Sequence, residues 1–150
     1  MTATNHALTG AVIALAIKQP VLAVPLAFLS HFVLDMVLHL EARDLPEKWV
    51  LRVIGADLLI GNLLAIMLPL ILITDVSAWT IFLCMVIAMS PDYIWCWRYV
   101  LIKDKDRVFD EPMSWFSHIH KKVQKQSLRG AWVETVWLIG MVLLVKLLID

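Results

Sequence analysis

The sequence predicts an all-α integral membrane protein, a helical bundle of four to five transmembrane helices that forms a single domain over residues 1–150. Apolar residues make up 61% of the chain and charged residues 17%, whereas soluble domains average roughly one half and about one quarter. The mean hydropathy is +0.79, and the apolar residues gather in five segments that polar connections separate. The formal net charge of +0 gives no sign of a nucleic-acid partner, and none is expected.

Residues 7–17 form the first apolar segment, which is shorter than the about 20 residues that a spanning helix needs. A short, tilted or partly inserted helix is expected there, and a cleaved signal peptide is the alternative. The remaining apolar segments cover residues 20–39, 49–73, 77–102 and 128–148. Pro91 lies inside the fourth segment and is expected to kink its helix, because proline removes one backbone hydrogen bond.

The long connection at residues 103–127 separates the last two segments. Apolar and basic residues alternate at 113–124, which predicts an amphipathic helix at the membrane interface, with a solvated loop as the alternative. Lys and Arg are concentrated on the side of the bundle that receives this connection. Basic loops stay in the cytoplasm, so a multi-pass membrane protein with these loops inside is expected. Cys84 and Cys96 lie in one apolar segment and are interpreted as buried thiols.

Ionisable residues interrupt the apolar segments, and the second segment has the densest set. His31, Asp35 and His39 follow one another at intervals of four residues, which places them on one face of a helix. Charged groups inside a spanning helix are costly and typically mark a functional site. For any one of these histidines, the alternative is a packing residue that is hydrogen-bonded to a neighbouring helix.

Counting along each segment from its cytoplasmic end places the other ionisable residues in the same layer. At about 1.5 Å per residue, Asp57 lies roughly 12 Å deep, Asp92 about 15 Å and Glu134 about 8 Å. His6 begins the first segment on that side, and His120 lies at the interface. The predicted metal ligands, or hydrogen-bonding neighbours of the ligands, are His6, His31, Asp35, His39, Asp57, Asp92 and His120.

Imidazole and carboxylate groups together favour a divalent transition metal, with zinc as the first choice and manganese or iron as alternatives. Such an ion would cancel the charge of the carboxylates and activate a water molecule for hydrolysis. Glu134 or Asp92 is predicted to act as the catalytic general base. Taken singly, Asp57 could instead pair with Arg52 or Arg98, and Glu134 could reach toward the membrane interface.

An ordered set of short motifs runs through roughly the first hundred residues: Asn5-His6-x-x-Thr9-Gly10, then Ser30-His31-x-x-x-Asp35-x-x-x-His39, then Pro91-Asp92. This set resembles the membrane-bound metal-dependent hydrolase family (domain of unknown function 457), small inner-membrane proteins of bacteria and archaea. The resemblance implies a helical membrane protein with metal chemistry, located in a bacterial or archaeal cytoplasmic membrane.

These features predict a metal-dependent hydrolase that acts on a lipid or lipid-linked phosphoester at the cytoplasmic leaflet. Arg52, Arg98, Lys121 and Lys122 are candidates for holding the phosphate headgroup, and in the alternative interpretation they only anchor the topology. Two other classes stay open: a metal-ion or proton transporter or channel component, and a noncatalytic membrane scaffold. A transporter needs polar groups that continue to the opposite face, whereas the outer halves of the last three segments are almost free of ionisable residues. A homodimer is also considered, because five helices enclose little volume.

Overall fold

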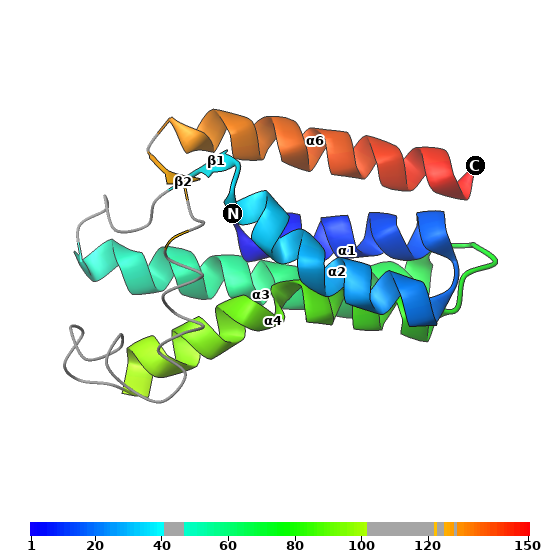
Figure 1. Cartoon of the computed structure of the whole chain (residues 1–150), viewed down its shortest axis with the longest axis horizontal. Coiled ribbons are helices and arrows are strands. Elements are labelled where there is room, and N and C mark those ends of the chain that lie inside the picture. Colours follow the sequence, from blue (N-terminus) through cyan, green and yellow to red (C-terminus); the bar gives the residue numbers. More distant parts are fainter. Residues whose placement is uncertain (41–46, 102–121, 123–124, 128) are drawn as a thin grey trace.

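The computed structural model describes residues 1–40, 47–101, 122, 125–127 and 129–150. Within these residues the fold is all-α, as the sequence predicts. The elements are α1 (Ala3–Ile17), α2 (Pro20–Asp35), β1 (Leu38–His39), α3 (Glu47–Ile71), α4 (Ala78–Leu101), β2 (Lys125–Gln126) and α6 (Gly130–Ile149). The helices run side by side along the long axis of the molecule (Figure 1).

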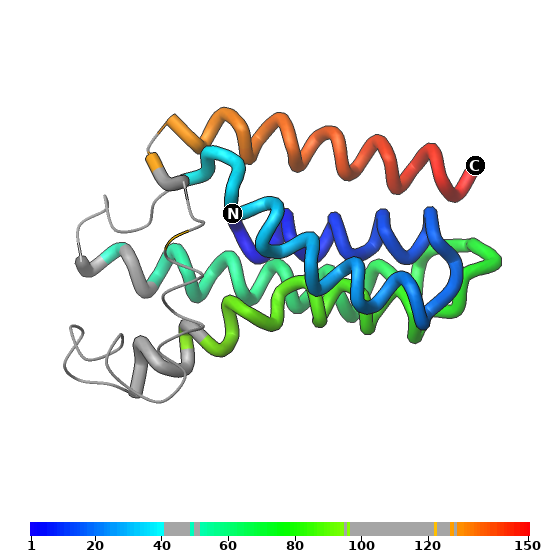
Figure 2. The backbone as a smooth tube through the Cα atoms, in the orientation of Figure 1, coloured from blue at the N-terminus to red at the C-terminus, as the bar shows by residue number. Residues whose placement is uncertain are grey.

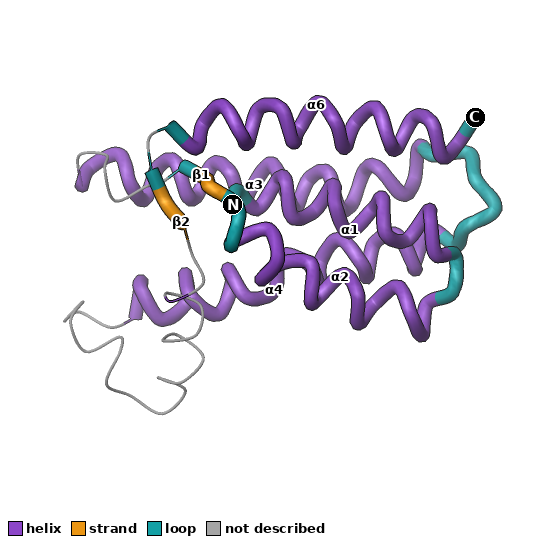
Figure 3. Tube along the Cα trace, turned by 45° about the horizontal axis from the view of Figure 1, so that its top comes forward, coloured by secondary structure: helices purple, strands orange, loops and turns teal. Residues whose placement is uncertain are grey.

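The short first helix, α1, is the centre of the bundle, because it contacts each of the other four described helices. The amino terminus lies beside β1, and the carboxyl terminus lies at the opposite end of the bundle (Figure 3). Small side chains line the buried face of α1, and close helix packing in membranes depends on such residues. They are Ala3, Ala7, Gly10, Ala11 and Ala14.

Two glycines set how closely the helices approach one another. A Cβ atom on Gly10 of α1 would lie 2.4 Å from the carbonyl oxygen of Cys84 on α4. A Cβ atom on Gly61 of α3 would lie 2.8 Å from the sulfur of Met89, again on α4. At Gly10 the contact is with the α4 backbone, so only glycine allows α1 and α4 to approach this closely, whereas the Met89 side chain at Gly61 is flexible and can shift.

Large apolar side chains cover the outside of this bundle, while several polar side chains are buried inside it. Val21, Leu70 and Leu147 are 83%, 72% and 71% exposed, whereas His6, His31 and Asp35 are each 0% exposed. Such a distribution inverts the pattern of a soluble protein, which rarely exposes large contiguous apolar patches.

Two of the described helical stretches, Arg52–Ile71 and Gly130–Ile149, are long and apolar enough to cross a membrane. The other apolar stretches, Ala3–Ile17, Pro20–Asp35 and Ala78–Ile94, are shorter. The four- to five-span arrangement therefore stays a prediction.

The second helix is shorter than predicted, because α2 ends at Asp35 and His39 lies in β1. The prediction that His39 continues the helical face of His31 and Asp35 is therefore wrong. β1 pairs in parallel with β2, with His39 opposite Gln126, and the backbone N–H of Ser127 donates to the carbonyl of His39 over 2.9 Å. This pairing joins segments far apart in the chain, so helical spacing alone gives no sign of it.

The fourth helix contains Pro91, and Figure 2 shows α4 changing direction partway along its length, which agrees with the expected kink. Because proline has no N–H, the carbonyl of Ile87 loses its helical donor. The hydroxyl of Ser90 donates to that carbonyl over 2.8 Å instead. The predicted interfacial helix at 113–124 and the ligand candidate His120 lie outside the described residues.

Replacing Gly10 with alanine is expected to destabilise the bundle by about 1–3 kcal/mol, because the new methyl group would overlap the α4 backbone. Thermal unfolding of the detergent-purified protein measures this effect. Gly55→Ala is the matched control, since a Cβ atom at Gly55 meets nothing within 4 Å. Equal losses of stability in the two variants would contradict the packing described for α1.

Candidate metal centre

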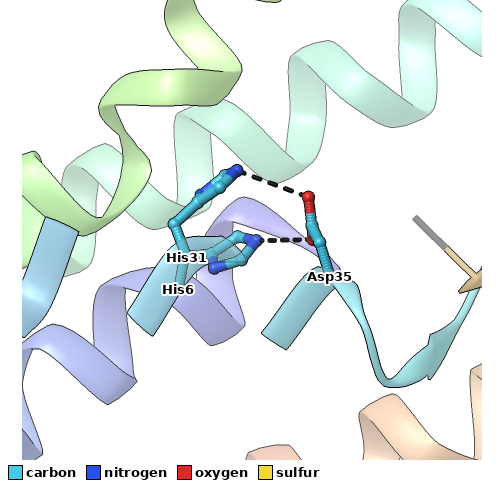
Figure 4. Close-up of side chains that lie close together, drawn as sticks. All are labelled: His6, His31 and Asp35. Carbon is cyan, nitrogen blue, oxygen red and sulfur yellow. Dashed lines mark ion pairs between the residues drawn. The ribbon is translucent and has the colours of Figure 1, made fainter. Parts of the chain in front are cut away.

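Side chains from α1 and α2 meet in the interior near the end of α2 (Figure 4). They are His6, His31 and Asp35, whose possible ligand atoms all lie within 4.8 Å of one another. The Nε2 atom of His6 lies 3.3 Å from Oδ1 of Asp35, and Nε2 of His31 lies 3.4 Å from Oδ2. The two imidazole rings stack with centroids 3.9 Å apart. One carboxylate therefore faces both rings, with one oxygen for each.

A second carboxylate, Asp92 on α4, approaches the same two nitrogens. Its Oδ2 lies 3.9 Å from Nε2 of His6, and its Oδ1 lies 3.8 Å from Nε2 of His31. The side chain of Asp92 is 21% exposed, whereas the side chains of the other three are fully buried. We call His6, His31, Asp35 and Asp92 the His/Asp site. Each Nε2 in it faces one oxygen of Asp35 and one of Asp92.

Local sequence explains how the ligand atoms of α2 are presented. His31 and Asp35 stand one turn apart on the same face of the helix, as their spacing predicts. The Nδ1 atom of His31 lies 2.9 Å from the carbonyl oxygen of Ala88, which belongs to the turn just before Pro91. A backbone carbonyl has two lone pairs and can accept from a neighbouring side chain in addition to its own helix.

This hydrogen bond also fixes the tautomer of His31. A carbonyl oxygen only accepts, so Nδ1 of His31 must carry the hydrogen. In the neutral ring, Nε2 then has a lone pair that faces the oxygens of Asp35 and Asp92. A proton on Nε2 or a metal ion between the ring and the carboxylates would turn these contacts into attractive ones.

Two further observations concern the ion pairs and hydrogen bonds of the polar groups around the site. The amino-terminal ammonium of Met1 pairs with Oδ1 of Asp35. The Nδ1 atom of His6 and the Oδ1 atom of Asn5 are buried and have no hydrogen-bond partner among the described residues. Because buried polar atoms are nearly always hydrogen-bonded, these atoms mark the surroundings of the site as incompletely satisfied.

Asp57, one of the predicted metal ligands, lies elsewhere in the bundle and closes the amino end of α1. Its carboxylate accepts hydrogen bonds from the backbone N–H groups of Ala3 and Thr4, at 2.6 and 3.1 Å, and from the hydroxyl of Thr4 at 2.7 Å. The first N–H groups of a helix have no partner within it, and Thr2 makes no side-chain capping bond. A carboxylate from α3 therefore caps α1, a role that one-dimensional spacing does not reveal.

Glu134 and His39 also make contacts apart from the His/Asp site. The Oε1 atom of Glu134 accepts from the backbone N–H of Leu40 over 3.0 Å, and its backbone carbonyl accepts from the Asn5 amide over 3.2 Å. The ring of His39 is buried in β1, where its Nδ1 lies 2.8 Å from the carbonyl of Val37. Among the described residues, neither belongs to the group of potential ligands around Asp35.

Polar residues beyond the site tie the helices together. The Tyr93 hydroxyl donates to the Asn62 side chain over 2.8 Å and so joins α4 to α3. The Trp137 indole donates to the Thr9 hydroxyl over 3.0 Å and joins α6 to α1. Sequence analysis missed Tyr93, Thr9 and Trp137 as partners, because none of these residue types is unusual in an apolar segment.

At the far end of the bundle, Lys18 donates to both carboxylate oxygens of Asp75, at 3.1 and 2.8 Å. This hydrogen bonding lowers the pKa of Asp75 below its usual value. The pair is exposed and joins the α1–α2 turn to the α3–α4 turn. Its charges cancel, so it adds no net charge to the far end of the bundle.

Comparison with known proteins gave no match: no family model, no curated protein and no solved structure is significantly similar to this chain.

Asp57→Ala is expected to lower the stability of the bundle by about 0.5–2 kcal/mol, because the amino end of α1 loses its acceptor. Asp57→Asn, which keeps one acceptor oxygen, should recover part of the loss. Denaturation of the purified protein, followed by circular dichroism, measures both effects. A loss in Asp57→Ala no larger than that in the exposed control Asp75→Ala would refute the capping role.

Proposed function

We propose that this chain is an integral membrane protein that binds a divalent transition metal at the His/Asp site and uses it to hydrolyse a lipid or lipid-linked phosphoester. The observation that carries the proposal is the placement of two imidazole nitrogens between two carboxylates in the interior. The residues are those that metal sites use, and zinc is the ion that they fit best.

Charge and distance both favour a divalent ion. With neutral rings, His6 and His31 contribute no charge, Asp35 and Asp92 contribute one negative charge each, and the Met1 ammonium beside Asp35 contributes one positive charge. Burying carboxylates in an apolar interior costs several kcal/mol, and a divalent cation would lower that cost further. Two ligands of a tetrahedral zinc ion lie about 3.3 Å apart when each bond is about 2.0–2.1 Å long. The separations of 3.3 and 3.4 Å between the two rings and Asp35 are compatible with this spacing, each to a different oxygen of the carboxylate.

The distribution of side chains supports a membrane location. Trp49 and Trp132 lie in the first turns of α3 and α6 at the end of the bundle that carries β1 and are 47% and 78% exposed. Trp79, at the start of α4, lies at the opposite end and is 71% exposed. Exposed tryptophans at both ends of an apolar bundle are typical of the two membrane interfaces.

Basic residues favour a cytoplasmic location for the end that carries the site. Arg52 and Arg129 lie at the starts of α3 and α6 and are exposed, whereas the far end holds the neutral pair Lys18–Asp75 and Lys146 in the last turn of α6. By the positive-inside rule the His/Asp site then faces the cytoplasmic leaflet. The resemblance of the early motifs to membrane-bound metal-dependent hydrolases points the same way and stays a prediction.

Hydrolysis requires a metal with room for a substrate and a base to take a proton. A divalent ion at this site would polarise a phosphoryl oxygen and promote ionisation of water. Asp92 stands farther from the rings than Asp35 and is the one partly exposed member of the site. These features support the proposal that Asp92 accepts a proton from an incoming water molecule. Arg52, which stacks over the ring of Trp49 at the interface, is a candidate for holding the phosphate of a lipid headgroup.

The observations around the site give less support to the two alternative functions, a transporter and a scaffold. A transporter needs a polar route to the opposite face, yet near the far end of the bundle the described buried polar residues are limited to Thr80. A scaffold needs only hydrogen bonds between helices, and the unsatisfied polar atoms around His6 do not serve that purpose.

Metal analysis of the purified protein tests the proposal. The wild type is expected to carry about one zinc, manganese or iron ion per chain, and His31→Ala and Asp35→Asn should lose it. Asp75→Asn is the matched control, because it removes an exposed carboxylate at the far end and should keep the metal. A wild type without bound transition metal after growth in metal-replete medium would overturn the proposal.

Asp92→Asn separates catalysis from binding. The variant is expected to bind metal at saturating concentration but to hydrolyse lipid phosphoesters in proteoliposomes at least about 100-fold more slowly, because the proton acceptor is missing. Release of headgroup phosphate measures the rate, and wild type treated with chelator gives the background. Full activity in Asp92→Asn would contradict the role of Asp92 as the base.

A further inference from the structure

Asp35 is the last residue of α2, so its backbone is held less firmly than that of a residue inside the helix. The ends of helices fray, because their terminal groups lack the hydrogen bonds that hold the interior turns. A metal ligand must nevertheless be held within a fraction of an ångström of its working position. The Met1 ammonium pairs with the Asp35 carboxylate, and contacts of the chain that follows Asp35 can hold its backbone.

The chain after Asp35 is hydrogen-bonded to α6. The backbone N–H of Leu40, five residues beyond Asp35, donates to Oε1 of Glu134 over 3.0 Å. Glu134 is only 7% exposed, so this bond to a carboxylate is shielded from water and is stronger than an exposed one. It joins the segment between α2 and α3 to the second turn of α6.

The first residue of α6 makes the second attachment. A Cβ atom on Gly130 would lie 2.0 Å from the carbonyl carbon of His39 and 2.2 Å from its oxygen. The backbone of β1 thus rests directly on the start of α6, at a distance that only glycine permits. His39 also pairs with Gln126 in β2, and its carbonyl accepts from the backbone N–H of Ser127, so the chain just before α6 holds β1 as well.

We propose that Glu134 and Gly130 form a clasp on β1 that holds Asp35 in its metal-binding position, so Glu134 is a positioning residue and not the general base. The inference rests on the proposed metal site and assigns α6 a part in it. Residues that orient metal ligands typically change metal affinity about 10–100-fold when mutated, although they never touch the ion. The same range is expected for the clasp.

The competing role for Glu134 is proton transfer, and the conservative substitution separates the two roles. Glu134→Gln keeps an acceptor oxygen for the Leu40 N–H but cannot take up a proton at neutral pH. A positioning residue tolerates this change, whereas a general base does not. Gly130→Ala tests the clasp at a residue with no chemistry of its own, because its methyl group would displace β1.

The experiment measures zinc affinity of the detergent-purified full chain by competition with a chromophoric chelator. Glu134→Ala and Gly130→Ala are expected to bind zinc about 10–100-fold more weakly than wild type, and Glu134→Gln should bind like wild type. Two controls lie on the same helix. Thr135→Val removes an exposed hydroxyl that donates to the Ala131 carbonyl of the same helix, and Gly140→Ala adds a methyl group with no atom of the described residues within 4 Å.

Hydrogen exchange of backbone amides, measured without metal, is the second readout. Amides of residues 36–40 should exchange faster in Glu134→Ala and Gly130→Ala than in wild type, while those of α3 keep their protection, which shows that the bundle is folded. Wild-type zinc affinity in Glu134→Ala, or an equal loss in Glu134→Gln, would overturn the clasp. A wild type that binds no zinc would instead overturn the metal site, and the exchange data would still report whether Glu134 and Gly130 hold β1.

Discussion

The rest of the structure depends on one constraint, which is the placement of two imidazole nitrogens between two carboxylates. His6 and His31 each direct Nε2 toward Asp35 and Asp92, and His31 is held in this orientation by the carbonyl of Ala88. In water such a group of acceptors would be hydrated separately. In an apolar interior a cation near the carboxylates lowers the cost of burying them, and the Met1 ammonium lies beside Asp35. The proposed metal ion would add to this compensation.

The bundle is built so that three helices can bring these groups together. Small residues on α1, above all Gly10, let its backbone reach α4, and the carbonyl of Ala88 on α4 contacts His31. Asp57 satisfies the amino end of α1 from α3, so the helix that carries His6 begins at a fixed point. Apolar side chains cover the outside. The polar side chains His6, His31 and Asp35 are buried in the interior of this bundle.

Sequence reasoning predicted the parts of this arrangement that depend on local periodicity and on depth. The all-α fold follows from apolar segments of helical length, and the meeting of His31 and Asp35 follows from their spacing of four residues. The convergence of His6 and Asp92 follows from counting residues from the membrane surface. Depth does not tell which side of a helix a residue occupies, so Asp57 and Glu134 were counted with the site although they bond to α1 and to Leu40. His39 was misplaced because its backbone pairs with β2, a contact across more than eighty residues that no local pattern records.

X-ray absorption spectroscopy of the zinc-loaded protein tests the central claim most directly, since it reports the atoms around the ion. Two imidazole nitrogens from His6 and His31, together with carboxylate oxygen, should give nitrogen and oxygen neighbours at about 2.0–2.1 Å and the multiple-scattering pattern of histidine. That pattern should disappear in His31→Ala. A spectrum dominated by sulfur at about 2.3 Å, as from Cys84 or Cys96, or one without histidine features, would contradict the account.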